Sequence, residues 1–182
     1  MAAVIDRLSI GRTARLTEHW RLRDGASVTI RPVRPEDAPM EQAFIRGLSS
    51  ESRYARFLFG ARELPAALLA RFTEVDQENH VALVVTVDDG GGPVLVADGR
   101  YVREGEGAEF ALVVADTWQG RGIGRRLLAT LIRLARGAGV GALTGDILHT
   151  NRRMILLARD AGFAVLTHPD DARLVRARMA LR

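Results

Sequence analysis

The chain contains no cysteine among its 182 residues. This absence excludes disulfide bonds, thiolate metal ligands and a cysteine nucleophile, and it agrees with a reducing compartment. Long apolar runs are missing too, and the short one at residues 2–5 is too small for the core of a signal peptide. No stretch approaches the roughly 18 unbroken apolar residues that a membrane-spanning helix needs. We therefore expect a cytoplasmic protein that has no membrane partner.

Lysine is absent as well, so all 26 basic residues are arginines, and the net charge is +4. Arginine stays charged at any relevant pH and binds phosphate oxygens in bidentate geometry, which suits a polyanionic ligand. The arginines are spread along the chain among acidic residues, and they form no basic block with aromatic residues between. We therefore expect no nucleic-acid partner.

Length and composition are those of one soluble globular domain, with 47% hydrophobic and 26% charged residues. Residues 1–24 are irregular and basic and predict an N-terminal extension, so the domain is expected over residues 25–182. Hydrophobic patterns and turn residues predict strands near 27–33, 81–87, 94–102, 108–114, 140–148, 163–166 and 174–179, and helices near 35–46, 50–57, 65–72, 123–136 and 151–161. This order predicts an α/β domain with a mixed, mostly antiparallel central sheet and helices on both faces.

The most informative segment is a glycine-rich loop between a predicted strand and an amphipathic helix. The first N–H groups of a helix have no internal partner, and together with the helix dipole they attract anions. Glycine lets the backbone approach a phosphate closely, and the nearby arginines add positive charge. The loop is therefore predicted to bind a phosphate or pyrophosphate through Gln119, Gly120, Arg121, Gly122, Ile123, Gly124 and Arg125.

The loop has three other interpretations. A dinucleotide fingerprint requires Gly-x-Gly-x-x-Gly in the first turn of a parallel sheet, whereas the glycines here alternate at positions 120, 122 and 124. A nucleotide P-loop requires a lysine, and the chain has none. A tight strand–helix connection that binds no ligand remains the alternative.

Two motifs of the sequence resemble motifs of the GNAT acyltransferases. Their acyl-CoA loop, Gln/Arg-x-x-Gly-x-Gly/Ala, is matched by Gln119, Gly122 and Gly124, and a later Asn…Gly-Phe signature is matched by Asn151 and residues 162–163. The resemblance spans roughly residues 27–180 and implies a single-domain GNAT fold that uses acetyl-CoA and no metal.

The resemblance also implies roles for individual residues. The loop amides would hold the CoA pyrophosphate, and Val113 and Val114 would pair with the pantetheine amides where two strands splay apart. Asn151 would contact the cofactor or its thiol end; the alternative is a helix N-cap, and both roles are compatible.

Acyl transfer to an amine requires a base, because a protonated nitrogen has no lone pair. The candidate is Glu109, which by strand alternation shares a face with Ala111 and Val113. Partial burial there would raise its pKa; the alternative is a glutamate at a solvated edge. Glu78 is the reserve candidate, with a surface charge as its alternative.

A closer resemblance points to the catalytic domain of bacterial Pat-type protein lysine acetyltransferases. It is carried by segments at residues 31–37, 48–57, 76–82, 108–111 and 151–159. It implies that Glu109 is the base. The tyrosine that many GNAT enzymes use as an acid is replaced by Ala158, so the acid is unassigned, and we interpret Tyr54 and Tyr101 as structural.

The sequence therefore predicts an acetyl-CoA-dependent N-acetyltransferase whose acceptor is a primary amine, with a protein lysine side chain as the first hypothesis. The alternatives are an N-acetyltransferase for small-molecule amines and a non-catalytic acyl-CoA-binding sensor module. An oligomer is compatible with the sequence.

Overall fold

The computed structural model describes all residues except 1–12, 14–15, 59, 61, 89 and 182. The strands are β1 (Glu18–Arg21), β2 (Ser27–Pro32), β3 (His80–Asp88), β4 (Pro93–Glu104), β5 (Gly107–Val114), β6 (Ala142–Leu148), β7 (Ala164–Thr167) and β8 (Leu174–Ala180). The helices are α2 (Ala38–Gly47), α3 (Ser50–Phe57), α4 (Ala66–Thr73), α5 (Ile123–Gly137) and α6 (Arg152–Asp160), with short 3-10 helices η1 (Pro35–Asp37) and η2 (Asp116–Trp118). None of the described helices is long and apolar enough to cross a bilayer.

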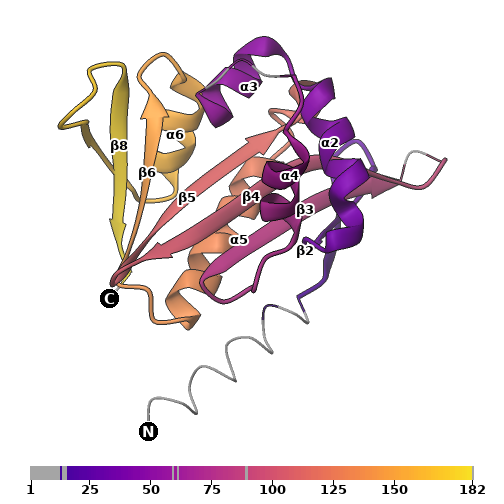
Figure 1. Ribbon diagram of the computed structural model, residues 1–182, viewed down its shortest axis with the longest axis horizontal. Helices are drawn as coiled ribbons and strands as arrows, with labels where there is room; N and C mark the ends of the chain where they lie inside the picture. The colour runs from indigo at the N-terminus through magenta and orange to yellow at the C-terminus, as the bar shows by residue number, and fades with distance from the viewer. Residues whose placement is uncertain (1–12, 14–15, 59, 61, 89, 182) are drawn as a thin grey trace, which may run out of the picture.

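The strands form one mixed sheet in the order β1-β2-β3-β4-β5-β6-β8-β7 (Figure 1). Neighbouring strands are antiparallel except β5 and β6, which are parallel. That pair is joined only at Ala108–Leu143 and Glu109–Thr144, after which the two strands diverge. The predicted mixed, mostly antiparallel sheet is confirmed, and its centre contains an open seam between β5 and β6.

The back layer consists of α5 and α6, and α5 crosses behind the sheet in Figure 1. Apolar residues at helical spacing in α5 give it one buried stripe, in which Leu127, Leu128 and Leu131 are fully buried. The helix lies close to the sheet, since a Cβ at Gly99 of β4 would come 2.8 Å from the Leu127 side chain.

The front layer consists of α2, α3 and α4 (Figure 1). Ser49 starts α3 as its N-cap, and its hydroxyl accepts a hydrogen bond from the Ser52 N–H at 3.1 Å. Phe44 and Ile45 of α2 are buried against Val84 of β3 and Val113 of β5. Both faces of the sheet are therefore covered, as predicted.

Strand β1 differs from the prediction, because it lies within residues 1–24, which were expected to be an extension outside the domain. It pairs antiparallel with β2, so residues 18–21 belong to the sheet. The strand is short and contains one large apolar residue, Trp20, which packs at the edge of the back core beneath the Arg126 guanidinium. A pattern of four residues is too short to separate a strand from a loop by periodicity.

Candidate active site

The seam exposes backbone groups of β5 that no neighbouring strand uses. Ala115 N–H donates to Val96 C=O of β4 at 2.8 Å, while Val114 C=O accepts from the Gln119 side chain at 3.0 Å on the opposite edge. Because peptide groups alternate in direction along a strand, those of Leu112 and Val114 face the seam. The peptide N–H and C=O groups of Val113 face β4, opposite Asp98. They therefore do not face the seam, where they were expected to pair with the pantetheine amides.

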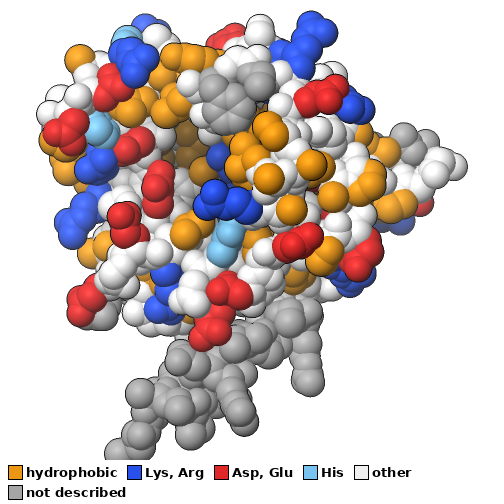
Figure 2. Space-filling model, in the orientation of Figure 1, with side chains coloured by type: hydrophobic (Ala, Val, Ile, Leu, Met, Phe, Trp, Pro, Cys, Tyr) orange, Lys and Arg blue, Asp and Glu red, His pale blue; other side chains and the backbone are white. Residues whose placement is uncertain are grey.

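The face of the molecule is hollowed where β5 and β6 diverge, and hydrophobic side chains line the hollow (Figure 2). Behind the hollow, Gly145 of β6 lies against Phe110 in the back core, where a Cβ at Gly145 would come 2.7 Å from the Phe110 ring. The seam therefore offers an apolar passage beside a row of hydrogen-bonding groups.

The glycine-rich loop leads from β5 into α5 at the end of the seam. Gly120 and Gly122 have φ of 75° and 86°, a left-handed conformation that favours glycine. Gly122 is the N-cap of α5, and none of the described residues accepts a hydrogen bond from the N–H groups of residues 120–125. A Cβ at either glycine would meet no atom within 4 Å. Open space, orphan N–H groups and the helix dipole together suit a phosphate group.

The third glycine of the loop, Gly124, has a different role. It lies in the first turn of α5, where a Cβ would come 3.4 Å from Leu157 of α6 and 3.5 Å from Val114. Its small size therefore lets α5 approach β5 and α6 closely.

The arginines of the loop are engaged by exposed carboxylates. Arg121 pairs with Asp24 at 2.6 Å and lies over the Trp118 ring, while Arg125 pairs with Asp160 at 3.0 Å. Exposed ion pairs of this kind are worth about 1 kcal/mol or less. A phosphate group can therefore compete for both arginines at little cost.

Asp116, which sequence reasoning missed, ties the start of this loop to α3. Its carboxylate accepts hydrogen bonds from Ser49 N–H at 2.9 Å, from the Ser49 hydroxyl at 2.8 Å and from the Ser52 hydroxyl at 2.8 Å. Desolvation opposes ionisation, but these hydrogen bonds outweigh it and lower the pKa of Asp116. The partners lie more than 60 residues apart, so no local sequence pattern indicates the contact.

The side chains of Gln119 and Asn151 lie at the ends of their elements. The Gln119 amide bridges Val114 C=O and the Arg153 guanidinium, which donates to its Oε1 at 2.6 Å. Asn151 Oδ1 accepts from Met154 N–H at 3.1 Å and caps α6. The N-cap role predicted as one alternative for Asn151 is thus observed.

Glu109 lies on the front face at the closed end of the seam, beside its last β6 partner, Thr144. Its side chain is exposed, yet desolvation by the surrounding sheet, followed by the charges of Asp146 and Glu104, raises its pKa. Arg176 and Arg56 act in the opposite direction. A carboxylate whose pKa is raised toward neutrality is a better general base.

The Asp146 charge near Glu109 is held in place by two neighbours. Arg176 donates to both carboxylate oxygens at 2.8 and 2.9 Å, and His168 Nε2 lies 3.0 Å from one of them. Hydrogen bonds from Arg176 are the main cause that lowers the pKa of Asp146. A carboxylate thus stays ionised on β6 across the seam from Glu109.

The other predicted candidates lie elsewhere. Glu78 lies in the turn before β3, where its N–H donates to Asp76 at 2.9 Å. Tyr101 is 1% exposed and faces the back core, Tyr54 is exposed on α3, and Ala158 is fully buried in α6. No tyrosine hydroxyl therefore occupies the position of Ala158.

The sequence profile of the acetyltransferase (GNAT) family matches residues 44–163. The chain belongs to the GNAT family of acetyltransferases. This GNAT domain is 36% identical over 169 residues to an acetyltransferase of Pseudomonas aeruginosa, a match that covers 90% of each chain. It is an acetyl-CoA-dependent N-acetyltransferase, with acetyl-CoA as co-substrate.

Similarity also extends to proteins named Pat. The domain is 39% identical over 137 residues to acetyltransferase Pat of Mycolicibacterium smegmatis, and the match covers 74% of this chain and 40% of that one. The GNAT domain of S. lividans PAT has a crystal structure that superposes with a TM-score of 0.81 at 30% identity, covering 90% of this chain and 96% of that one. This GNAT domain thus corresponds to one part of the longer mycobacterial protein.

Proposed function

We propose that this enzyme acetylates a lysine side chain of another protein, with Glu109 as general base. The observation that carries the proposal is the position of Glu109 at the closed end of the seam, where its pKa is raised. The similarity to Pat and to the GNAT domain of S. lividans PAT supports this acceptor class.

The residues around the seam fit a CoA thioester. The orphan N–H groups from Gly120 to Arg125 would hold the pyrophosphate, together with the Arg121 and Arg125 side chains. The peptide groups of Leu112 and Val114 would pair with the pantetheine amides, and the Gln119 amide would leave Val114 C=O to make room. Asn151 keeps the start of α6 beside this path through its N-cap bond.

The acceptor nitrogen must reach the closed end of the seam uncharged. Acetyl-CoA supplies a thioester whose carbonyl carbon forms the new C–N bond while the C–S bond breaks and its electrons leave on sulfur. Glu109 accepts one proton from the ammonium group so that the nitrogen lone pair can attack, and solvent accepts the second proton. Water also protonates the leaving sulfur, and Glu109 returns its proton to the solvent before the next turnover.

The charges around Glu109 favour a cationic acceptor. Desolvation is the main cause that raises the pKa of Glu109, and the negative charges of Asp146 and Glu104 add to it. These carboxylates attract a positive ammonium group that approaches this end of the seam. A lysine side chain is long enough to bring its nitrogen into a hollow while the rest of its protein stays outside.

The Glu109→Gln variant tests the base. We expect turnover to fall about 100-fold or more, the scale of general-base catalysis, while acetyl-CoA affinity stays within about twofold. Glu63→Gln is the matched control, because Glu63 is exposed and pairs with Arg46 of α2 at 2.9 Å. Equal rates for Glu109→Gln and the wild type would remove Glu109 from the mechanism.

Labelled acetyl-CoA with a panel of protein, peptide and small-amine acceptors tests the substrate class. Transfer to protein lysines supports the proposal. Exclusive transfer to amino acids or polyamines would indicate a small-molecule enzyme, and cofactor binding without turnover on any amine would indicate a sensor.

A further inference from the structure

Two phenylalanine rings fill the space behind the seam. Phe110 of β5 is 3% exposed, and its ring centroid lies 4.8 Å from that of Phe163, with the ring planes tilted by 44°. Both side chains belong to the back core, on the side of the sheet where α6 lies in Figure 1. The gap between β5 and β6, which is hollowed at the front in Figure 2, therefore has an aromatic wall at its back.

The Phe110 ring reaches across this gap from one strand to the other. Glu109 and Thr144 form the last pair that joins β5 to β6, so Phe110 and Gly145 come directly after that pair on their strands. A Cβ at Gly145 would lie 2.7 Å from one carbon of the Phe110 ring and 3.0 Å from two others. The ring therefore packs against the backbone of β6 and closes the back of the gap at the point where the strands begin to diverge.

The proposed path of acetyl-CoA brings its thioester to this ring. The two pantetheine amides would pair with the peptide groups of Val114 and Leu112, which face the seam two residues apart. Residues of a strand rise about 3.3 Å each, so the same step of about 6.6 Å leads from Leu112 to the level of Phe110. The two carbons between the second amide and the sulfur cover most of that step. The acyl group would therefore lie beside Phe110 and next to Glu109.

An acyl chain at this position has little room to extend. The acceptor amine must reach the carbonyl carbon from the front, where the Glu109 side chain lies. Along the seam, the pairs that join β5 to β6 close the gap. At the back lies the Phe110 ring, held between the β6 backbone and Phe163. A longer chain would have to displace this ring, and a close-packed core resists added methylenes.

We propose that Phe110 determines the acyl specificity: its ring limits the donor to acetyl-CoA and excludes butyryl and longer acyl groups. The proposal rests on the proposed path of the CoA thioester along the seam. It depends neither on the identity of the acceptor nor on Glu109 as the base. Phe110 transfers no proton and acts only through the volume of its ring.

Phe110→Leu tests the proposal, because leucine keeps an apolar side chain in the core but removes the ring. The measurements are kcat/KM for acetyl-CoA and butyryl-CoA with one amine acceptor, and the Kd of both thioesters by calorimetric titration. For the wild type we expect kcat/KM to be at least about tenfold higher with acetyl-CoA, the lower end of what one methylene is worth in a closed pocket. In Phe110→Leu this preference should fall about tenfold, and butyryl-CoA should bind more tightly relative to acetyl-CoA.

The matched control is Phe44→Leu, the same change at a buried phenylalanine of α2 on the front of the sheet. We expect both variants to lower the free energy of unfolding, but only Phe110→Leu to change the acyl preference. If Phe110→Leu does not fold, Phe110→Met takes its place. Methionine fills a similar space with a flexible chain that can move aside, so it should shift the preference in the same direction.

A folded Phe110 variant that keeps the acyl preference of the wild type would overturn the proposal. A wild type that uses butyryl-CoA as well as acetyl-CoA, or an equal shift in Phe44→Leu, would also contradict it. The titrations need no acceptor, so they separate the two hypotheses. A wild type that acetylates no protein lysine, or a Glu109→Gln variant with an unchanged rate, contradicts the proposed function and leaves the role of Phe110 to the titrations.

Discussion

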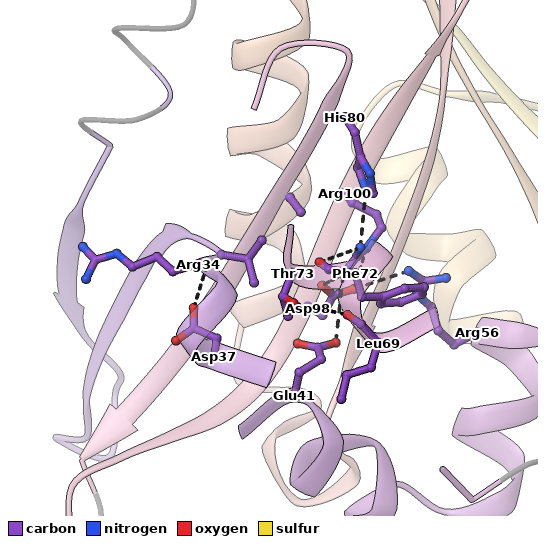
Figure 3. A network of polar contacts seen from close by, with 12 residues as sticks. Arg34, Asp37, Glu41, Arg56, Leu69, Phe72, Thr73, His80, Asp98 and Arg100 are labelled. Atoms are coloured by element: carbon purple, nitrogen blue, oxygen red, sulfur yellow. Dashed lines mark hydrogen bonds and ion pairs between the residues drawn. The ribbon is translucent and has the colours of Figure 1, made fainter. Parts of the chain in front are cut away.

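The two layers of helices stabilise the same sheet by different means. Behind the sheet, α5 buries leucines and isoleucines and directs its arginines outward to partners such as Glu18 and Asp160. In front of it, α2, α3 and α4 converge on a buried cluster of Glu41, Asp98 and Arg100 (Figure 3).

The two layers differ in the kind of interaction that they bury. Burying apolar side chains is favourable at roughly 25 cal/mol per Å², whereas burying ion pairs often costs more than the pair returns. The back layer therefore draws its stability from apolar burial, whereas the front layer combines a smaller apolar core with buried ion pairs. It is the front layer that shares a face with Glu109.

The largest effect that separates the layers is expected in the back core. Leu131 of α5 is fully buried, so Leu131→Ala should lower the free energy of unfolding by about 2–5 kcal/mol, through lost burial and the cavity left behind. The pH profile of kcat/KM should not move, because no charge near Glu109 changes. Chemical denaturation and the pH profile measure the two effects.

Leu156→Ala is the control for that change, since Leu156 of α6 is 58% exposed and its loss should cost no more than about 0.5 kcal/mol. A shift in the acidic limb of the kcat/KM profile for Leu131→Ala would show that the back core also affects the titration of Glu109.

The next effect concerns the start of α5, where the proposed pyrophosphate site lies. Valine at Gly122 would be strained at its φ of 86° and would put a side chain in the open space before the loop amides. For Gly122→Val we expect the Kd for acetyl-CoA to rise about tenfold or more, measured by calorimetric titration.

Gly137→Val is the matched control at the far end of the same helix. A Cβ there meets no atom within 4 Å, and its φ is not positive. Tight acetyl-CoA binding by Gly122→Val would show that the pyrophosphate is held elsewhere.

The sequence predicted the helices of both layers to within three residues at each end. Apolar residues that recur every fourth position define α5, and the alternating glycines mark the loop before it, because both signals are local. Strand β1 was missed because it is short and exposes alternate residues at the edge of the sheet.

The polar contacts of the front layer could not be predicted, because each joins residues far apart in sequence. Asp98 meets Arg56 across 42 positions, and Asp116 meets Ser49 across 67. The direction of the Val113 peptide groups was also hidden, since it depends on which edge of β5 pairs with β4. These features can be derived only once the pairing register of the strands is known.

A third effect sharpens the comparison within the front layer itself. The folded state raises the pKa of Glu41 from 4.5 to about 8, so between these values the folded chain keeps a proton that the unfolded chain has lost. The stabilising contribution of Glu41 is therefore complete below pH 4.5, decreases as the pH rises from 4.5 to about 8, and is constant above that pH. Glu41→Gln removes this dependence but keeps the shape of the side chain.

We expect the variant to gain stability relative to the wild type as pH rises through this window, and the difference in Tm to become constant above it. All other titrating groups are common to both proteins, so the difference isolates Glu41. Arg46→Gln, at an exposed pair on the same helix, should leave the difference flat. A pH-independent difference for Glu41→Gln would mean that Glu41 is ionised in the fold. The network of Glu41, Asp98, Arg56 and Arg100 would then be electrically balanced.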